Sequence, residues 1–155
     1  MAIEKVKATN YLQHHLIMKY KTEKDILNLV ENFENGTVAE KDWRHAGHLI
    51  VAFYYLSNHN FATATNKMRD GIFNLLKSFG VDLTKMMPYH ETLTIFWMRT
   101  VDDFKSSKNG YSVVEIGNEL IETFDKDFPL NFYSRKLLFS DEARAKFVEP
   151  DLREF

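Results

Sequence analysis

The chain has 155 residues, of which 20 are basic and 22 acidic, giving a formal net charge of -2. A hydrophobic fraction of 45% and a charged fraction of 27% are typical of a globular protein, and the length predicts one domain over residues 1–155. No block of like charge occurs, which argues against a nucleic-acid-binding protein. Cysteine is absent, which excludes disulfides, thiolate ligands and cysteine nucleophiles. Because MAIEKVKATN lacks the apolar segment of a signal peptide and no apolar run is long enough to span a membrane, we expect a cytoplasmic protein without a membrane partner.

Apolar residues recur at helical spacing along most of the chain, and strand alternation is hard to find. The sequence therefore predicts an all-α fold, a bundle of about six helices followed by a short C-terminal helical segment. The first predicted helix spans about residues 10–21, and the second runs from the N-cap Thr22 to the turn at 34–36. The third spans about residues 40–58, and the fourth follows Asn60 and stops at Gly80. The fifth runs from Pro88 to about 104, and the sixth begins after the N-cap Ser112. A last short helix is expected between Ser140 and Pro150.

Two histidines open the segment DWRHAGHLIVAFYYL, which is otherwise apolar. His45 and His48 are three residues apart, so on a helix both imidazoles lie on one face. Such a pair can bind a first-row metal ion. By itself the pair is equally well explained by rings that are hydrogen-bonded at the edge of the core.

A third histidine in the segment PYHETLT strengthens the case for a site. Short connections predict that the third, fourth and fifth helices run up, down and up, which brings His90 to the same end of the bundle as His45 and His48. The sequence therefore predicts a cluster of three histidines. The motifs His-Glu-x-x-His and paired Glu-x-x-His are absent. If a metal ion binds, the fitting form is a mononuclear three-histidine site for Zn²⁺ or Fe²⁺.

Further residues near the histidines are candidates for a reaction. Glu91 is predicted to act as a general base or a further ligand, and in a metal-free version His90 takes part in acid–base catalysis with Glu91. Trp43, Thr92 and Thr94 are predicted to contact a substrate. For the two threonines, a hydrogen bond to the preceding turn of their own helix is an equal alternative.

The motifs also resemble those of a known group of proteins. Trp43-x-His-x-x-His-Leu, Tyr-His90-Glu-Thr-x-Thr and the C-terminal pattern YS…S..AR…PDL resemble an uncharacterised family of small bacterial helical proteins, over roughly residues 33–152. The resemblance implies that His45, His48, His90, Glu91 and Thr92 form a shared polar signature, and it implies no particular activity. Many members carry an acid where this chain has Gly47, and the C-terminal pattern implies a structural clamp.

Three functions are consistent with these features. The first is a metal-dependent or His/Glu acid–base enzyme acting on a small molecule. The second is a small-molecule-binding protein, because aromatic residues make up 14% of the chain and can line a cavity as well as fill a core. The third is an interaction module, such as a homodimer, in which the histidines are structural.

Overall fold

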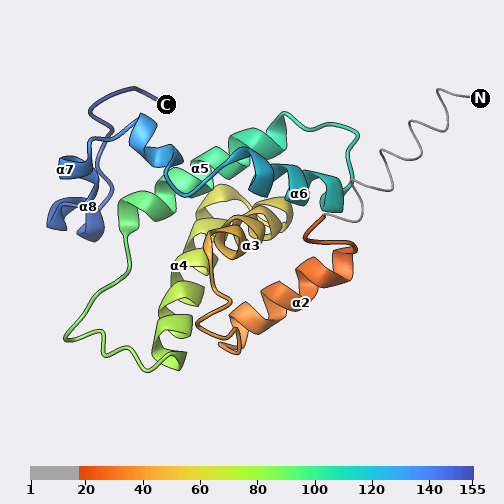
Figure 1. Cartoon of the computed structure of the whole chain (residues 1–155), viewed down its shortest axis with the longest axis horizontal. Helices are drawn as coiled ribbons and strands as arrows, with labels where there is room; N and C mark the ends of the chain where they lie inside the picture. Colours follow the sequence, from red (N-terminus) through yellow and green to blue (C-terminus); the bar gives the residue numbers. More distant parts are fainter. Residues whose placement is uncertain (1–17) are drawn as a thin grey trace, which may run out of the picture.

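The computed structural model describes residues 18–155, and every regular element in that part is helical, as predicted (Figure 1). The elements are α2 (Glu23–Glu34), α3 (His45–Asn58), α4 (Phe61–Ser78), α5 (Glu91–Ser106), α6 (Val113–Thr123), a 3₁₀ turn η1 (Phe128–Asn131), α7 (Arg135–Leu138) and α8 (Asp141–Ala145). Within this part, no helix combines the length and the apolar character that crossing a bilayer requires. The predicted helix at 10–21 falls mostly outside the described residues, and its last four residues, 18–21, are not helical.

The predicted N-caps set where several helices begin. Thr22 and Ser112 form capping boxes with Asp25 and Glu115, and Ser140 caps α8. Two predicted starts were wrong. Residues 40–42 form a turn and residues 43–44 are not helical, so α3 begins at His45, and α5 begins three residues after Pro88.

Helix α3 lies at the centre of the molecule and contacts α2, α4, α5 and α6 (Figure 1). Seven of its hydrophobic residues are buried on all sides of the helix: Leu49, Ile50, Val51, Ala52, Phe53, Tyr55 and Leu56. A helix that is apolar around its whole circumference is stable in water only when other elements surround it. The run of apolar residues after the two histidines is therefore what places the first turn of α3 inside the bundle.

Two glycines allow aromatic rings to pack closely against helices. A Cβ atom at Gly71 would lie 2.2 Å from Cε1 of Phe33, so only glycine lets α4 approach that ring. A Cβ atom at Gly47 would lie 3.1 Å from the Trp43 ring. Trp43 stacks on Phe33 with ring centroids 5.0 Å apart. The missing side chain of Gly47 therefore makes room for the Trp43 ring.

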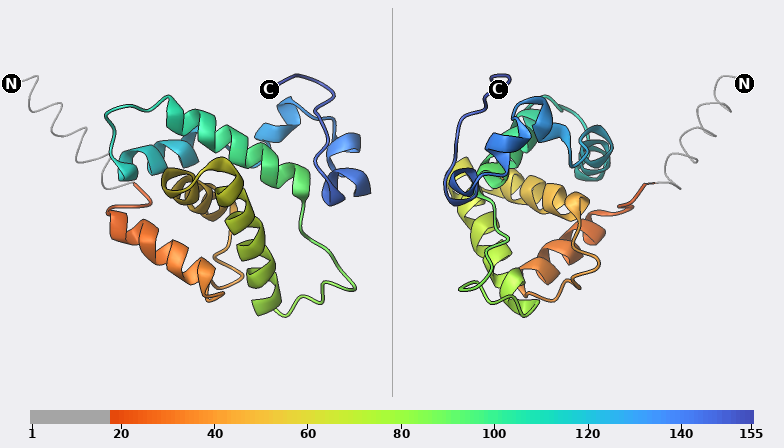
Figure 2. Two further views of the ribbon diagram at one scale, coloured as in Figure 1. Left: turned by 180° about the vertical axis from the view of Figure 1, so that it is seen from behind. Right: turned by 60° about the vertical axis from the view of Figure 1, so that its left-hand side comes forward.

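The C-terminal elements pack against the start of α5 (Figure 2). The Tyr133 hydroxyl donates to the Val148 carbonyl at 2.8 Å. The Asp151 carboxylate accepts from the Ser134 backbone N–H at 2.7 Å and from its hydroxyl at 2.6 Å. These contacts hold the last residues against η1 and α7, which is the clamp that the C-terminal motif implied.

Candidate functional site

A cavity of about 440 Å³ lies among α3, α4 and α5. Most of its wall is apolar, and the polar part includes all three predicted histidines and two cationic side chains. The apolar lining residues are Trp43, Ala52, Met68, Ile72, Pro88, Leu93, Trp97 and Met98, and the others are Arg44, His45, His48, Tyr89, His90, Thr94 and Lys126. This volume and this mixture of rings with a few polar groups are typical of small-molecule sites.

His48 presents a free ring nitrogen at the cavity. Its Nδ1 donates to the Arg44 carbonyl at 3.1 Å, and its ring packs on Trp43 with centroids 4.2 Å apart. Burial lowers the pKa of His48 to about 4, against the opposing effect of the bond to Arg44, so the ring is neutral at pH 7. With the proton held on Nδ1, Nε2 is an acceptor, and it has no hydrogen-bond partner within residues 18–155.

His45 also lines the cavity, but one of its ring nitrogens is bonded to the backbone at the end of α6. Its Nε2 lies 2.9 Å from the Phe124 carbonyl, and its ring packs on Trp97 with centroids 4.7 Å apart. A carbonyl accepts, so Nε2 carries the proton and donates it. This bond joins the first turn of α3 to the C-terminal end of α6, and it leaves Nδ1 of His45 as an acceptor with no hydrogen-bond partner within residues 18–155.

Both ring nitrogens of His90 are occupied. Nδ1 accepts from the backbone N–H of Leu93 at 3.2 Å, which makes His90 the N-cap of α5, and Nε2 donates to the Leu138 carbonyl at 2.6 Å. Burial lowers the pKa of His90, while the bond to Leu138 opposes this effect and the nearby charge of Arg144 adds to it. The ring is therefore neutral, with its proton on Nε2, and it fastens α7 to α5.

The predicted three-histidine metal site is not formed in this structure. The three rings line one cavity, as expected, but His90 has no free nitrogen, and Nε2 of His45 is a donor. Among residues 18–155, no group of three or more histidine, aspartate or glutamate side chains is arranged to hold a metal ion. The physical reason is that the Leu93 N–H and the Leu138 carbonyl use both ring nitrogens of His90, so this ring has no lone pair for a metal ion.

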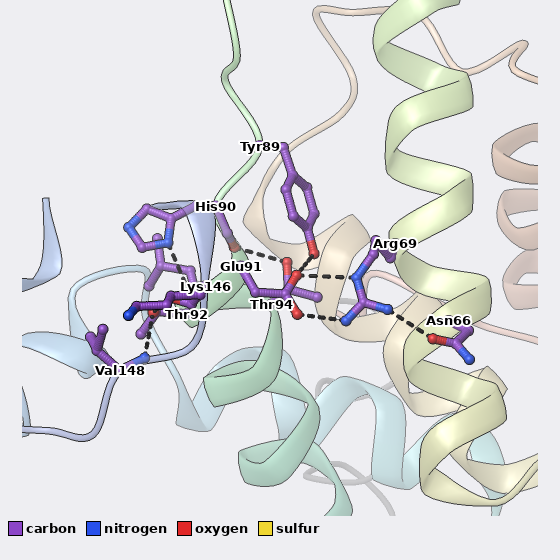
Figure 3. Close-up of polar contacts among 10 residues, drawn as sticks. Asn66, Arg69, Tyr89, His90, Glu91, Thr92, Thr94, Lys146 and Val148 are labelled. Carbon is purple, nitrogen blue, oxygen red and sulfur yellow. Dashed lines mark hydrogen bonds and ion pairs between the residues drawn. The ribbon is translucent and has the colours of Figure 1, made fainter. Parts of the chain in front are cut away.

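Glu91 is held in an ion-pair network and contacts none of the histidine rings (Figure 3). Arg69 on α4 donates to both carboxylate oxygens, with Nε at 3.1 Å from Oε2, and the Tyr89 hydroxyl donates to Oε2. Burial alone would raise the pKa of Glu91, but the bonds from Arg69 and Tyr89 outweigh it and hold the pKa below its usual value. Three donors occupy acceptor positions of this carboxylate, which joins α4 to α5. Its role as a general base stays a prediction.

The two threonines differ in position. The fully buried Thr92 hydroxyl donates to the Lys146 carbonyl at 3.0 Å and accepts from the Val148 N–H at 3.2 Å, so it holds the C-terminal segment and does not line the cavity (Figure 3). Its predicted contact with substrate is corrected. The Thr94 hydroxyl donates to the His90 carbonyl at 3.0 Å, the alternative kept open from the sequence, and Thr94 does line the cavity together with Trp43.

We expect Thr92→Val, which keeps the shape of the side chain, to lower the free energy of unfolding by about 2 kcal/mol. The change leaves the N–H of Val148 and the carbonyl of Lys146 without their hydroxyl partner. Urea unfolding measures the change, and limited proteolysis should cut the C-terminal segment faster. Thr100→Val is the matched control, because the Thr100 hydroxyl bonds only to its own helix, at Phe96. Equal effects of the two variants would contradict the proposed clamp.

Several cavity residues were not singled out from the sequence. Trp97 and Lys126 were missed because nothing in their local pattern separates them from a core residue and a surface lysine. Arg69 pairs with the partly buried Glu91. Arg144 lines a second cleft of about 570 Å³, beside Arg69.

The chain was also compared with known proteins. No family model, no curated protein and no solved structure matches the chain. The resemblance to small bacterial helical proteins therefore stays a prediction based on the quoted motifs, and the candidate site has to be interpreted from its own geometry.

Proposed function

We propose that the protein binds a small, largely apolar molecule in the cavity among α3, α4 and α5. The observation that carries the proposal is the apolar cavity of about 440 Å³, whose lining includes His48 with a free acceptor at Nε2. Trp43 and Trp97 contribute apolar ring atoms to the lining, and removing such surface from water on ligand binding is favourable. A hydroxyl or N–H on the ligand would donate to Nε2 and set the orientation of the ligand.

The geometry favours binding over the acid–base enzyme. In that alternative, Glu91 orients a catalytic histidine, but Glu91 is bonded to Arg69 and Tyr89. His90 uses both ring nitrogens on backbone groups, which leaves it no lone pair with which to accept a proton from a substrate. His48 keeps a free acceptor, but its pKa of about 4 makes it a weak base at neutral pH.

Binding of 1-naphthol, measured by isothermal titration calorimetry, tests the proposal. Ile72 lines the cavity, and Ile72→Trp should fill it and weaken binding by about tenfold or more. The matched control is Leu27→Trp on α2, a residue that is 40% exposed and outside the cavity lining, which should leave the affinity unchanged. Thermal melting of each variant shows whether it folds.

His48→Phe tests the polar half of the proposal, because phenylalanine keeps a ring against Trp43 and removes the acceptor. The native protein should bind 1-naphthol about fivefold to tenfold more tightly than naphthalene, and the variant should bind both about equally. Absence of 1-naphthol binding, or binding that Ile72→Trp leaves unchanged in a folded protein, would contradict the proposal.

A further inference from the structure

We infer that the ligand of this cavity is an amphipathic organic acid, with its apolar body between the tryptophan rings and its anionic group at the opening, beside Arg44 and Lys126. This inference rests on the proposed function and adds the charge of the ligand to it. The two charged side chains of the lining have the same sign, belong to exposed residues and have no ion-pair partner within residues 18–155.

The charged residues of the cavity lining are all cationic. Arg44 precedes α3, and Lys126 lies between α6 and η1; no aspartate or glutamate lines the cavity. Both side chains belong to exposed residues, whereas most of the other lining residues are at least half-buried, so the two cations lie at the open side. The carboxylates close in sequence, such as Glu40 and Asp125, are exposed and outside the lining.

Neither cation is neutralised by an ion pair. Five ion pairs occur within residues 18–155, and none involves Arg44 or Lys126. The contacts of Arg44 are two long hydrogen bonds of 3.4 Å from its Nη1 to backbone carbonyls, which leave its other N–H groups available. The second cleft is different, because two of its cations, Arg69 and Lys146, are paired with Glu91 and Glu142.

The backbone at the start of α3 adds positive charge beside Arg44. Helix α3 has 14 residues, and no side chain caps its N-terminus, where Arg44 is the N-cap. The N-terminal end of a helix carries partial positive charge, which favours a nearby anion. An apolar cavity whose only net charge is positive and lies at its opening matches a molecule with one anionic end, because the apolar body can enter while the charge stays partly hydrated.

The test compares naphthalene-1-acetate with its neutral isostere naphthalene-1-acetamide, both measured by calorimetry at low salt. The native protein should bind the acid about tenfold more tightly than the amide. In the double variant Arg44→Gln/Lys126→Gln, the acid should lose about tenfold in affinity and the amide should change less than about twofold. Raising the salt concentration should weaken binding of the acid only.

Arg135→Gln/Lys136→Gln is the matched control, because it removes two exposed cations of α7 that line neither cleft. An equal loss of acid binding in this control would mean that net charge alone acts, and would overturn the inference. Equal binding of acid and amide, both blocked by Ile72→Trp, would also overturn it while leaving the proposed cavity function intact. Failure of both probes and of 1-naphthol would remove the proposed function itself.

Discussion

Replacement of His90 by alanine is expected to lower the free energy of unfolding by about 3 kcal/mol. The imidazole accepts from the Leu93 N–H as the N-cap of α5, and loss of such a cap costs about 1 kcal/mol. The same ring donates to the carbonyl of Leu138, a residue that is 2% exposed, and a buried acceptor left without its donor costs about 1–3 kcal/mol. Urea denaturation at neutral pH measures the sum.

Two further variants separate these contributions. His90→Asn can still cap α5 but is too short to replace the bond to Leu138, so it should cost less than the alanine variant. His59→Ala removes an exposed histidine and should change stability by less than about 0.5 kcal/mol. A chelator such as EDTA should leave the melting temperature of the native protein unchanged. If the chelator lowered it as much as His90→Ala does, a metal-binding role for His90 would be restored.

Stability should fall as the pH is lowered through the window set by His48. The pKa of this ring is about 4 in the folded protein and 6.5 in the unfolded chain, so between these pH values the unfolded chain binds a proton that the folded protein does not. The free energy of unfolding therefore decreases with decreasing pH across this window. The contribution of His48 to that free energy should drop by about 2 kcal/mol between pH 7 and pH 5.

The matched comparison is with His48→Phe, which keeps an aromatic ring on Trp43 and cannot titrate. Other groups titrate in both proteins, so the difference between their unfolding free energies isolates His48. That difference should shift by about 2 kcal/mol in favour of the variant on going from pH 7 to pH 5. The variant Leu27→Ala, at an exposed residue that does not titrate, should show a constant difference from the native protein. A constant difference for His48→Phe as well would contradict the buried, neutral ring.

Local sequence predicted much of the fold, because helix starts depend on nearest neighbours. Thr22, Ser112 and Ser140 cap helices as expected, since a short polar side chain and an N–H three residues later suffice for the bond. The start of α5 was predicted at Pro88 from the same type of rule. The N-cap is instead His90, a residue type that the preferences for N-caps do not favour.

The meeting of His45, His48 and His90 at one cavity also followed from the sequence, through the order of three helices joined by short connections. The hydrogen-bond partner of each ring nitrogen could not be predicted from the sequence. The partner of His90 is 48 residues away at Leu138, and that of His45 is 79 residues away at Phe124. Helical periodicity carries no information about which distant carbonyl arrives at a ring.

The sequence by itself therefore determined an all-helical fold, most helix boundaries and a shared cavity for three imidazoles, because periodicity, caps and short connections act over a few residues. Only the tertiary structure decided that His90 is a structural cap, that Glu91 pairs with Arg69, and that His48 keeps a free acceptor. The reason is that each polar side chain bonds to the groups that packing brings within about 3 Å of it. Those groups belong to segments far apart in the chain, so the local sequence does not identify them.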